Sequence, residues 1–255
     1  MAGVMHADTH VHADPHAQAF SYPLMYWVGM NTAPDADPAA IAEFNHFYSH
    51  VHAPEVIAGN PGFARATRYE LLEPDPRGDF GPRWLAMYEM KDEAAAQMYI
   101  ERNDNPSATR PTYTPLPPAW QDATTKWRMI WRNIAECGSA SEPPYSIFMV
   151  GMNIPADTDA AGLDAFNSFY SATHVPEVMA AGGYARGTRF ELYREFLHPA
   201  PGAPRFCAIY EADKAATEAR ALSRGGHKLT AGPPVWDKHD TLWRLVYRRI
   251  DPDEV

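Results

Sequence analysis

The sequence has too few cysteines for a disulfide framework. Its 255 residues include only Cys137 and Cys207, which fall at different positions of the repeat described below and form no zinc-binding pattern. Basic residues are also scarce: 22 lysines and arginines stand against 32 aspartates and glutamates, for a formal net charge of −10. A phosphate-binding surface needs positive charge, so we expect no nucleic-acid partner and no binding to anionic membranes.

Long apolar runs and several well-known motifs are missing too. No run approaches the roughly 20 apolar residues that a membrane helix needs, and the N-terminus lacks the layout of a signal peptide. We therefore expect no membrane partner, and the absence of a disulfide framework favours a cytoplasmic location. The sequence also contains no GxGxxG after a strand, no GxxxxGKS/T, no GxSxG and no HExxH. A nucleotide cofactor is not expected, and we predict that the protein uses no cofactor.

What the sequence does contain is a long internal repeat. Phe44–Val56 reads FNHFYSHVHAPEV and Phe166–Val178 reads FNSFYSATHVPEV, at an offset of 122 residues (166 − 44). The likeness continues on both sides, for example from Val28–Asn31 to Val150–Asn153. Solenoid repeats are much shorter, roughly 20–50 residues. Two copies of a whole domain are therefore predicted, and a composition of 45% hydrophobic residues can supply their cores.

The repeat sets the expected domain boundaries. One unit spans 22–137 and the other 145–255, and the small and polar stretch 138–144 links them. Residues 1–21 form an arm that contains four histidines and could chelate a divalent metal. Nothing in the arm suggests a rigid scaffold, so we interpret it as a mobile polar segment and predict no metal site.

Each unit is predicted to fold in the order β-α-β-β-α-β, which is the ferredoxin-like arrangement. Apolar alternation and helical spacing place strands near 25–30, 64–72, 83–90 and 125–134, and helices near 38–51 and 92–102. The second unit repeats them near 146–152, 185–193, 204–211 and 241–250, and near 159–171 and 214–224. The proline-rich run 106–118 is expected to be a long ordered loop or lid. Each unit would leave one sheet face bare, so we predict that the two bare faces close into an α+β barrel.

The first helix predicts where a histidine lies. Asp37 is a plausible N-cap with Pro38 at the first helical position. Pro54 is expected to end this helix, because proline cannot continue the hydrogen-bond ladder and restricts the residue before it. His52 would then stand at or just past the helix C-terminus.

The repeated motif resembles the dimeric α+β barrel superfamily, and within it the stress-responsive and EthD-like branches. The residues that carry the resemblance in the first copy are Phe44, Phe47, Tyr48, His52, Pro54, Glu55, Gly62, Phe63 and Arg68, and the second copy runs from Phe166 to Arg189. The resemblance covers about 22–250 and implies an internal pseudo-dimer, since relatives are usually homodimers of single units. A homo-oligomer of the fused chain, or pairing of the halves between chains, stays open.

The superfamily does not fix an activity. Relatives include isomerases, cofactor-free monooxygenases, polyketide cyclases, haem enzymes, lyases and proteins of no known activity, and fold alone does not choose among them. Haem is an alternative because barrels of this type can hold it on one histidine.

His52 and His174 are the first catalytic candidates. A histidine titrates near neutral pH, which suits proton transfer, and the resemblance places it near the mouth of the barrel. The alternative is a structural role, in which the imidazole satisfies the last carbonyls of the helix and complements its dipole. Both roles would be kept in both copies, so the repeat does not decide between them.

Four charged residues accompany the histidines. Glu55 and Glu177 lie three positions further on, close enough to orient the imidazole or to pair with Arg68 and Arg189. Such pairs are most often part of the scaffold. If either arginine instead points into a cavity, its fork would hold a carboxylate or a developing enolate oxygen. We count the arginines as catalytic candidates and the glutamates as substrate-binding ones.

Aromatic side chains complete the predicted site. Tyr88 and Tyr210 could donate a hydrogen bond to a substrate oxygen or relay a proton, or they could be plain core residues. An aromatic stripe on strands is more often core than pocket, yet so many rings in one barrel suggest walls for a flat apolar ligand. The tryptophans assigned to these walls are Trp27, Trp84, Trp127 and Trp131.

These features favour an enzyme that performs acid–base chemistry on a small, aromatic, oxygenated molecule. Its reaction would be a lyase step or an isomerisation, in which His52 or His174 moves the proton. One alternative is a cofactor-free or haem-dependent oxygenase. Another is a non-catalytic small-molecule-binding or stress-response protein, which would have a barrel packed solid with side chains.

Overall fold

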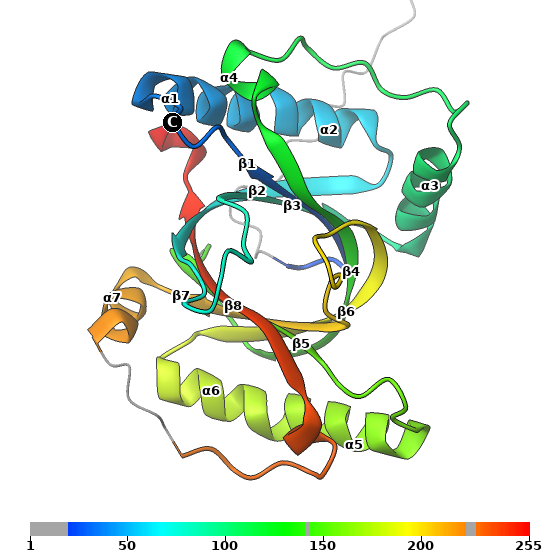
Figure 1. Cartoon of the computed structure of the whole chain (residues 1–255), viewed down its shortest axis with the longest axis vertical. Coiled ribbons are helices and arrows are strands. Elements are labelled where there is room, and N and C mark those ends of the chain that lie inside the picture. The colour runs from blue at the N-terminus through cyan, green and yellow to red at the C-terminus, as the bar shows by residue number, and fades with distance from the viewer. Residues whose placement is uncertain (1–19, 141–142, 223–227) are drawn as a thin grey trace, which may run out of the picture.

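A computed structural model describes residues 20–140, 143–222 and 228–255 (Figure 1). The strands of the first half are β1 (Leu24–Asn31), β2 (Phe63–Glu73), β3 (Trp84–Met90) and β4 (Thr124–Gly138). Its helices are α1 (Pro38–Phe47), α2 (Ala53–Gly59), α3 (Glu93–Asp104) and α4 (Pro118–Gln121).

The second half repeats this order. Its strands are β5 (Ser146–Asn153), β6 (Arg186–Leu197), β7 (Phe206–Ala212) and β8 (Asp240–Ile250). Its helices are α5 (Ala160–Phe169), α6 (Val175–Gly182) and α7 (Lys214–Leu222), with a 3₁₀ turn, η3 (Trp236–Lys238), at the place of α4. The predicted strands are confirmed to within a few residues. The unit boundaries at 22–137, 138–144 and 145–255 remain a prediction, and residues 1–19 of the histidine-bearing arm lie outside the described ranges.

The eight strands form one closed barrel in the order β1-β3-β2-β8-β5-β7-β6-β4, and every neighbouring pair is antiparallel. The two four-stranded sheets join through β2 with β8 and β4 with β6. Closure leaves no strand edge unpaired. The predicted α+β barrel is therefore confirmed. In Figure 1, α1, α2 and α4 cover one side of the barrel, and α5 and α6 cover the opposite side.

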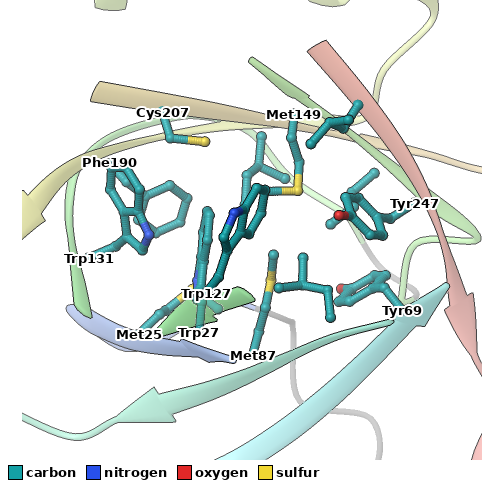
Figure 2. Close-up of a cluster of buried hydrophobic side chains, with 14 of the residues drawn as sticks. Met25, Trp27, Tyr69, Met87, Trp127, Trp131, Met149, Phe190, Cys207 and Tyr247 are labelled. Atoms are coloured by element: carbon teal, nitrogen blue, oxygen red, sulfur yellow. The ribbon is translucent and has the colours of Figure 1, made fainter. Parts of the chain in front are cut away.

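Alternation along the strands separates two faces. On β1, Met25 and Trp27 belong to the cluster inside the barrel, whereas Tyr26 packs toward the helices of its half. The interior is filled by aromatic rings and sulfur-bearing side chains, as Figure 2 shows. Trp127 and Trp131 lie in this cluster with no measurable exposure.

Their position corrects the expectation that these tryptophans line a ligand cavity. Trp27 packs against Trp131 with ring centroids 5.0 Å apart, and Trp127 stacks on Trp243 at 5.4 Å. The reason is the two-residue period of a strand, which sends all of them to the concave face, away from the helices. Trp84 lies on the outer face, but it packs on Phe44 of α1.

Pro54 does not end the first helix, contrary to the prediction. A π-helical turn, η1 (Tyr48–His52), follows α1, and the backbone N–H of Ala53 bonds to the carbonyl of Tyr48, five residues back. The chain then continues into α2 with Pro54 in its first turn, where a missing N–H costs least. A matching turn, η2 (Tyr170–His174), joins α5 to α6. Inserted π turns of this kind occur often at functional sites.

No helix of the described ranges is both long and apolar enough to cross a membrane.

Candidate functional site

A cavity of about 620 Å³ lies between the outer face of the first half's sheet and the helical layer above it. The strands β1, β3 and β4 form its floor, and η1, α2, α3, α4 and the segment 105–117 contribute to the walls. Its lining residues include Tyr26, Tyr48, His52, Tyr88, Trp120 and Arg128. The filled barrel interior is the feature expected of the non-catalytic alternative, but this gap between the sheet and the helices offers a ligand a separate place to bind.

His52 lies within a cage of rings. The imidazole centroid is 4.8 Å from that of Trp120, and 5.2 and 5.3 Å from those of Tyr48 and Tyr113. Burial lowers the pKa of His52 to about 4, against the smaller opposing effect of Glu55. Its Nδ1 is buried and has no hydrogen-bond partner among the described residues. The imidazole is therefore neutral at pH 7 and can accept a proton.

Two phenols share the lining of this cavity with the imidazole. The hydroxyl of Tyr88, on β3, donates to the hydroxyl of Tyr48 at 3.3 Å. Tyr48 also lines the cavity, so its own proton remains available to a substrate oxygen. Burial raises the pKa of both tyrosines, which keeps them protonated donors at neutral pH.

Arg68 lies beneath this layer and is absent from the lining of the cavity. Its Nη1 donates to the backbone oxygen of Asn45 and to the hydroxyl of Ser49, both at 2.9 Å, and its Nη2 donates to Oδ1 of Asn45 at 2.8 Å. The guanidinium carbon stands 4.3 Å from the ring centroid of Tyr48. Arg68 thus fastens α1 and η1 to the sheet.

The sequence suggested that Glu55 would orient His52 or pair with Arg68. Neither contact is present among the described residues. The Glu55 carboxylate accepts from the backbone N–H of Thr114 at 3.0 Å and from the Thr114 hydroxyl at 2.5 Å. These bonds lower the pKa of Glu55. Glu55 therefore holds the segment 105–117 beside the cavity.

Arg128 on β4 is a site residue that the sequence analysis missed. Its Nε donates to the hydroxyl of Tyr26 at 2.8 Å, and its Nη2 donates to Oδ1 of Asn103 at 2.7 Å and to the hydroxyl of Tyr99 at 3.3 Å. Strand alternation places Arg128 on the face opposite Trp127, which is a signal that could have identified it. The positions of Asn103 and Tyr99 on α3 could not be derived that way.

A smaller cavity of about 320 Å³ lies at the equivalent place in the second half and includes His174 and Tyr210. Burial lowers the pKa of His174 to about 4, and its Nδ1 also lacks a partner among the described residues. Glu177 accepts hydrogen bonds from the backbone N–H and hydroxyl of Thr230.

The scaffold below the second cavity repeats that of the first. Nη1 of Arg189 donates to the Ser171 hydroxyl at 2.8 Å, and Nη2 donates to Oδ1 of Asn167 at 2.9 Å. The linings differ, however, because Phe148 stands where the first half has Tyr26. The first cavity is larger and more hydrogen-bonding side chains line it, so it is the stronger candidate.

The structure thus brings together some of the predicted site residues and separates others. His52 lies with Tyr88, and His174 with Tyr210, in the lining of one cavity each. Neither histidine is at a helix terminus, because the π turn carries the helix onward. The pairing expected between the glutamates and the arginines is absent from the described contacts, since Thr114 and Thr230 take up the carboxylates.

No protein-family model matches the sequence, and no curated protein matches it. Among solved structures, the chain is similar to a mutant chlorite dismutase from Candidatus Nitrospira defluvii, with a TM-score of 0.51 and 9% identity over 94% of this chain and 97% of that one. A second mutant of that enzyme, in complex with cyanide, gives a TM-score of 0.50 and 9% identity over 91% and 92%. An anthrone oxidase-like protein gives 0.48 and 14% over 92% and 94%.

Similarity at such low identity concerns the fold. The chain shares the closed α+β barrel fold with these two chlorite dismutase structures. No family, branch or activity follows from these alignments.

Proposed function

We propose that the protein is a cofactor-independent oxygenase that acts on a small, oxygenated aromatic compound in the cavity beside His52. The observation that carries the proposal is the neutral imidazole, which lies among aromatic rings with its Nδ1 unpartnered in the described structure. An imidazole that is unprotonated at pH 7 can accept a proton from an aromatic substrate held beside it. Phenol and indole rings suit a flat ligand.

The chemistry begins with His52 accepting a proton from an acidic C–H of the substrate, which leaves a carbanion conjugated with the aromatic ring. The Tyr48 hydroxyl, which accepts from Tyr88, donates to the substrate oxygen on which the negative charge develops. The carbanion passes one electron to O₂, and the two radicals combine into a C–O bond. The peroxide then takes the proton back from the imidazolium, so that R–H and O₂ yield R–OOH.

Haem is the cofactor to consider for a barrel of this type. The residues around His52 fit haem poorly. A metal-ligating histidine almost always donates its second ring N–H to an acceptor, and Nδ1 of His52 is buried without one among the described residues. Trp120, Tyr48 and Tyr113 also pack against the imidazole. No step of the mechanism is therefore assigned to haem.

Oxygen uptake tests the proposal. The purified protein would be incubated with a panel of naphthols, anthrones and related hydroxylated aromatics, and both O₂ and substrate would be followed. We expect uptake that depends on substrate and falls at least a hundredfold in His52→Gln, while the matched variant His174→Gln keeps most of it.

Three other results would contradict the oxygenase, and each would assign a different function. Equal turnover under argon and air would assign a lyase or isomerase instead, with the same proton acceptor. A Soret band after addition of haemin, lost in His52→Gln, would assign a haem protein. Absence of turnover and of ligand binding in both variants and wild type would leave a non-catalytic protein.

A further inference from the structure

The charges around the cavity beside His52 narrow the class of substrate. Arg128 is the one lysine or arginine among the described residues of the lining, which include no aspartate and no glutamate. We infer that the substrate carries an anionic oxygen group, a carboxylate or a phenolate, that docks on Arg128 and the Tyr26 hydroxyl. The inference rests on the proposed function for the location of the reaction, but the charge argument stands on the cavity itself.

Arg128 is half-buried, and its partners are neutral. Tyr26, Tyr99 and Asn103 accept its hydrogen bonds, and its guanidinium carbon stands 5.4 Å from the ring centroid of Phe196. A partly desolvated cation without a carboxylate is costly, and an arriving anion removes that cost.

A neighbour on the same strand gives the contrast. Arg132, also on β4, pairs with Glu93 of α3 at 2.9 Å, and Arg194 on the adjacent strand β6 pairs with Asp104 of α3 at 2.9 Å. The helix α3 thus supplies carboxylates to the exposed arginines around Arg128, whereas it offers Arg128 an amide and a phenol. This arrangement holds the guanidinium in place without neutralising it.

The guanidinium also keeps donors free for a ligand. Its Nε and Nη2 make all three of the hydrogen bonds described above, and its Nη1 has no partner among the described residues. Arginine carries two N–H groups on that nitrogen. Tyr26 lines the cavity and its hydroxyl accepts from Arg128, so its own proton remains for a ligand oxygen. Two N–H donors and one O–H donor can therefore meet an oxyanion.

The whole-protein charge acts in the opposite direction but at long range. A formal net charge of −10 repels an approaching anion. Salt reduces that repulsion beyond about 8 Å at physiological ionic strength. A direct contact with Arg128 inside the cavity is screened much less, so the local charge decides binding and the net charge lowers the association rate.

The second half lacks this arrangement. Arg244 occupies the equivalent position on β8 and also lines its cavity, but it is exposed, and the described contacts of its side chain include no hydrogen bond that would hold the guanidinium in place. Phe148 replaces Tyr26 and brings no hydroxyl. We therefore assign the anion site to the first half alone, and Arg244 provides a matched control.

An anion in the cavity also changes His52. Negative charge close to an imidazole favours its protonated form. A bound carboxylate or phenolate would thus raise the pKa of His52 from its low value in the free protein and make it a stronger proton acceptor when substrate is present. The substrate's own charge would then prepare the base for the reaction.

The test compares probes that differ in charge. Binding of 2-naphthoate and of its neutral counterpart 2-naphthamide to the full chain would be measured by calorimetry, and 4-nitrophenol would be followed by its absorbance as it ionises. We expect 2-naphthoate to bind at least about tenfold more tightly than 2-naphthamide. Preferential uptake of 4-nitrophenolate without preference for 2-naphthoate would assign a phenolate rather than a carboxylate. Equal affinity for charged and neutral forms of both probes would overturn the inference.

Variants locate the site. Arg128→Gln should lose the preference for the anion, Arg128→Lys should keep part of it, and Arg244→Gln should keep all of it. If circular dichroism shows that Arg128→Gln does not fold, the comparison of 2-naphthoate with 2-naphthamide on the wild-type protein still tests the inference. Anion binding that depends on Arg128 in a protein that consumes no O₂ would contradict the oxygenase and leave this inference standing. Oxygen consumption with neutral substrates only would contradict this inference and leave the oxygenase standing.

Discussion

Glu55 and Thr114 join the helix α2 to the segment 105–117 through two hydrogen bonds to one carboxylate. Thr114 lies in the lining of the cavity, whereas Glu55 stands outside it. Glu177 and Thr230 repeat the contact in the second half. In each half, therefore, the glutamate three positions after the candidate histidine holds a segment that contributes to the lining of the cavity.

Replacing Glu55 should loosen that segment. In Glu55→Gln the amide carries one acceptor oxygen, and its NH₂ group cannot accept from the Thr114 N–H. We expect faster hydrogen exchange of backbone amides across 105–117 and faster release of a bound ligand, with little change elsewhere. Glu177→Gln should instead affect the segment around Thr230. Equal exchange of 105–117 in both variants would show that the bonds to Glu55 do not hold the segment.

The two buried histidines should make stability depend on pH. Burial lowers the pKa of His52 and of His174 to about 4, whereas in the unfolded chain both titrate near 6.5. Between these values the unfolded chain binds protons that the folded protein does not, so the free energy of unfolding falls as pH drops from about 6.5 toward 4. Urea unfolding at several pH values would measure the slope. The slope of the free energy of unfolding against pH should decrease in His52→Gln, and decrease further in the double variant with His174→Gln.

Arg68 should contribute to stability rather than to catalysis. It is 5% exposed, makes three hydrogen bonds to α1 and η1, and does not line the cavity. Arg68→Lys keeps the charge but loses the fork, and we expect it to lower the free energy of unfolding by about 2–4 kcal/mol. Arg189→Lys should do the same in the other half, and the two effects should add. Loss of ligand binding at unchanged stability would instead assign a direct role to Arg68.

The sequence was a good guide to the fold because the repeat and the apolar periods are local signals. Alternation along 64–72 puts Tyr69 and Arg68 on opposite faces of the strand, and the structure places them inside the barrel and under the helices, respectively. The π turn before Pro54 was not predictable by the same means. It depends on a hydrogen bond that skips one residue, and the sequence pattern of such a turn is that of an ordinary helix.

The site was harder to predict because it depends on distances between elements. Tyr88 was named as a residue that could donate a hydrogen bond to a substrate oxygen, and it lies in the lining of the cavity beside His52. Trp127 was assigned to a cavity wall, although its neighbour Arg128 faces the cavity, because the side of the sheet that holds a ligand cannot be read from alternation. The partner of Glu55 was missed for another reason, since Thr114 lies in a loop 59 residues away along the chain.

Two tryptophans should separate the roles of barrel and cavity. Trp131 lies inside the barrel with no measurable exposure, and Trp131→Ala would leave a large void there, so we expect a loss of about 3–5 kcal/mol in the free energy of unfolding. Trp120 stacks on Tyr48 at 4.8 Å and lies equally close to His52, beside a cavity that is already open. Trp120→Ala should therefore cost less stability but weaken 2-naphthoate binding at least about tenfold. Urea unfolding and calorimetry measure the two effects. The reverse pattern, with binding lost in folded Trp131→Ala and kept in Trp120→Ala, would place the ligand inside the barrel and contradict the site proposed beside His52.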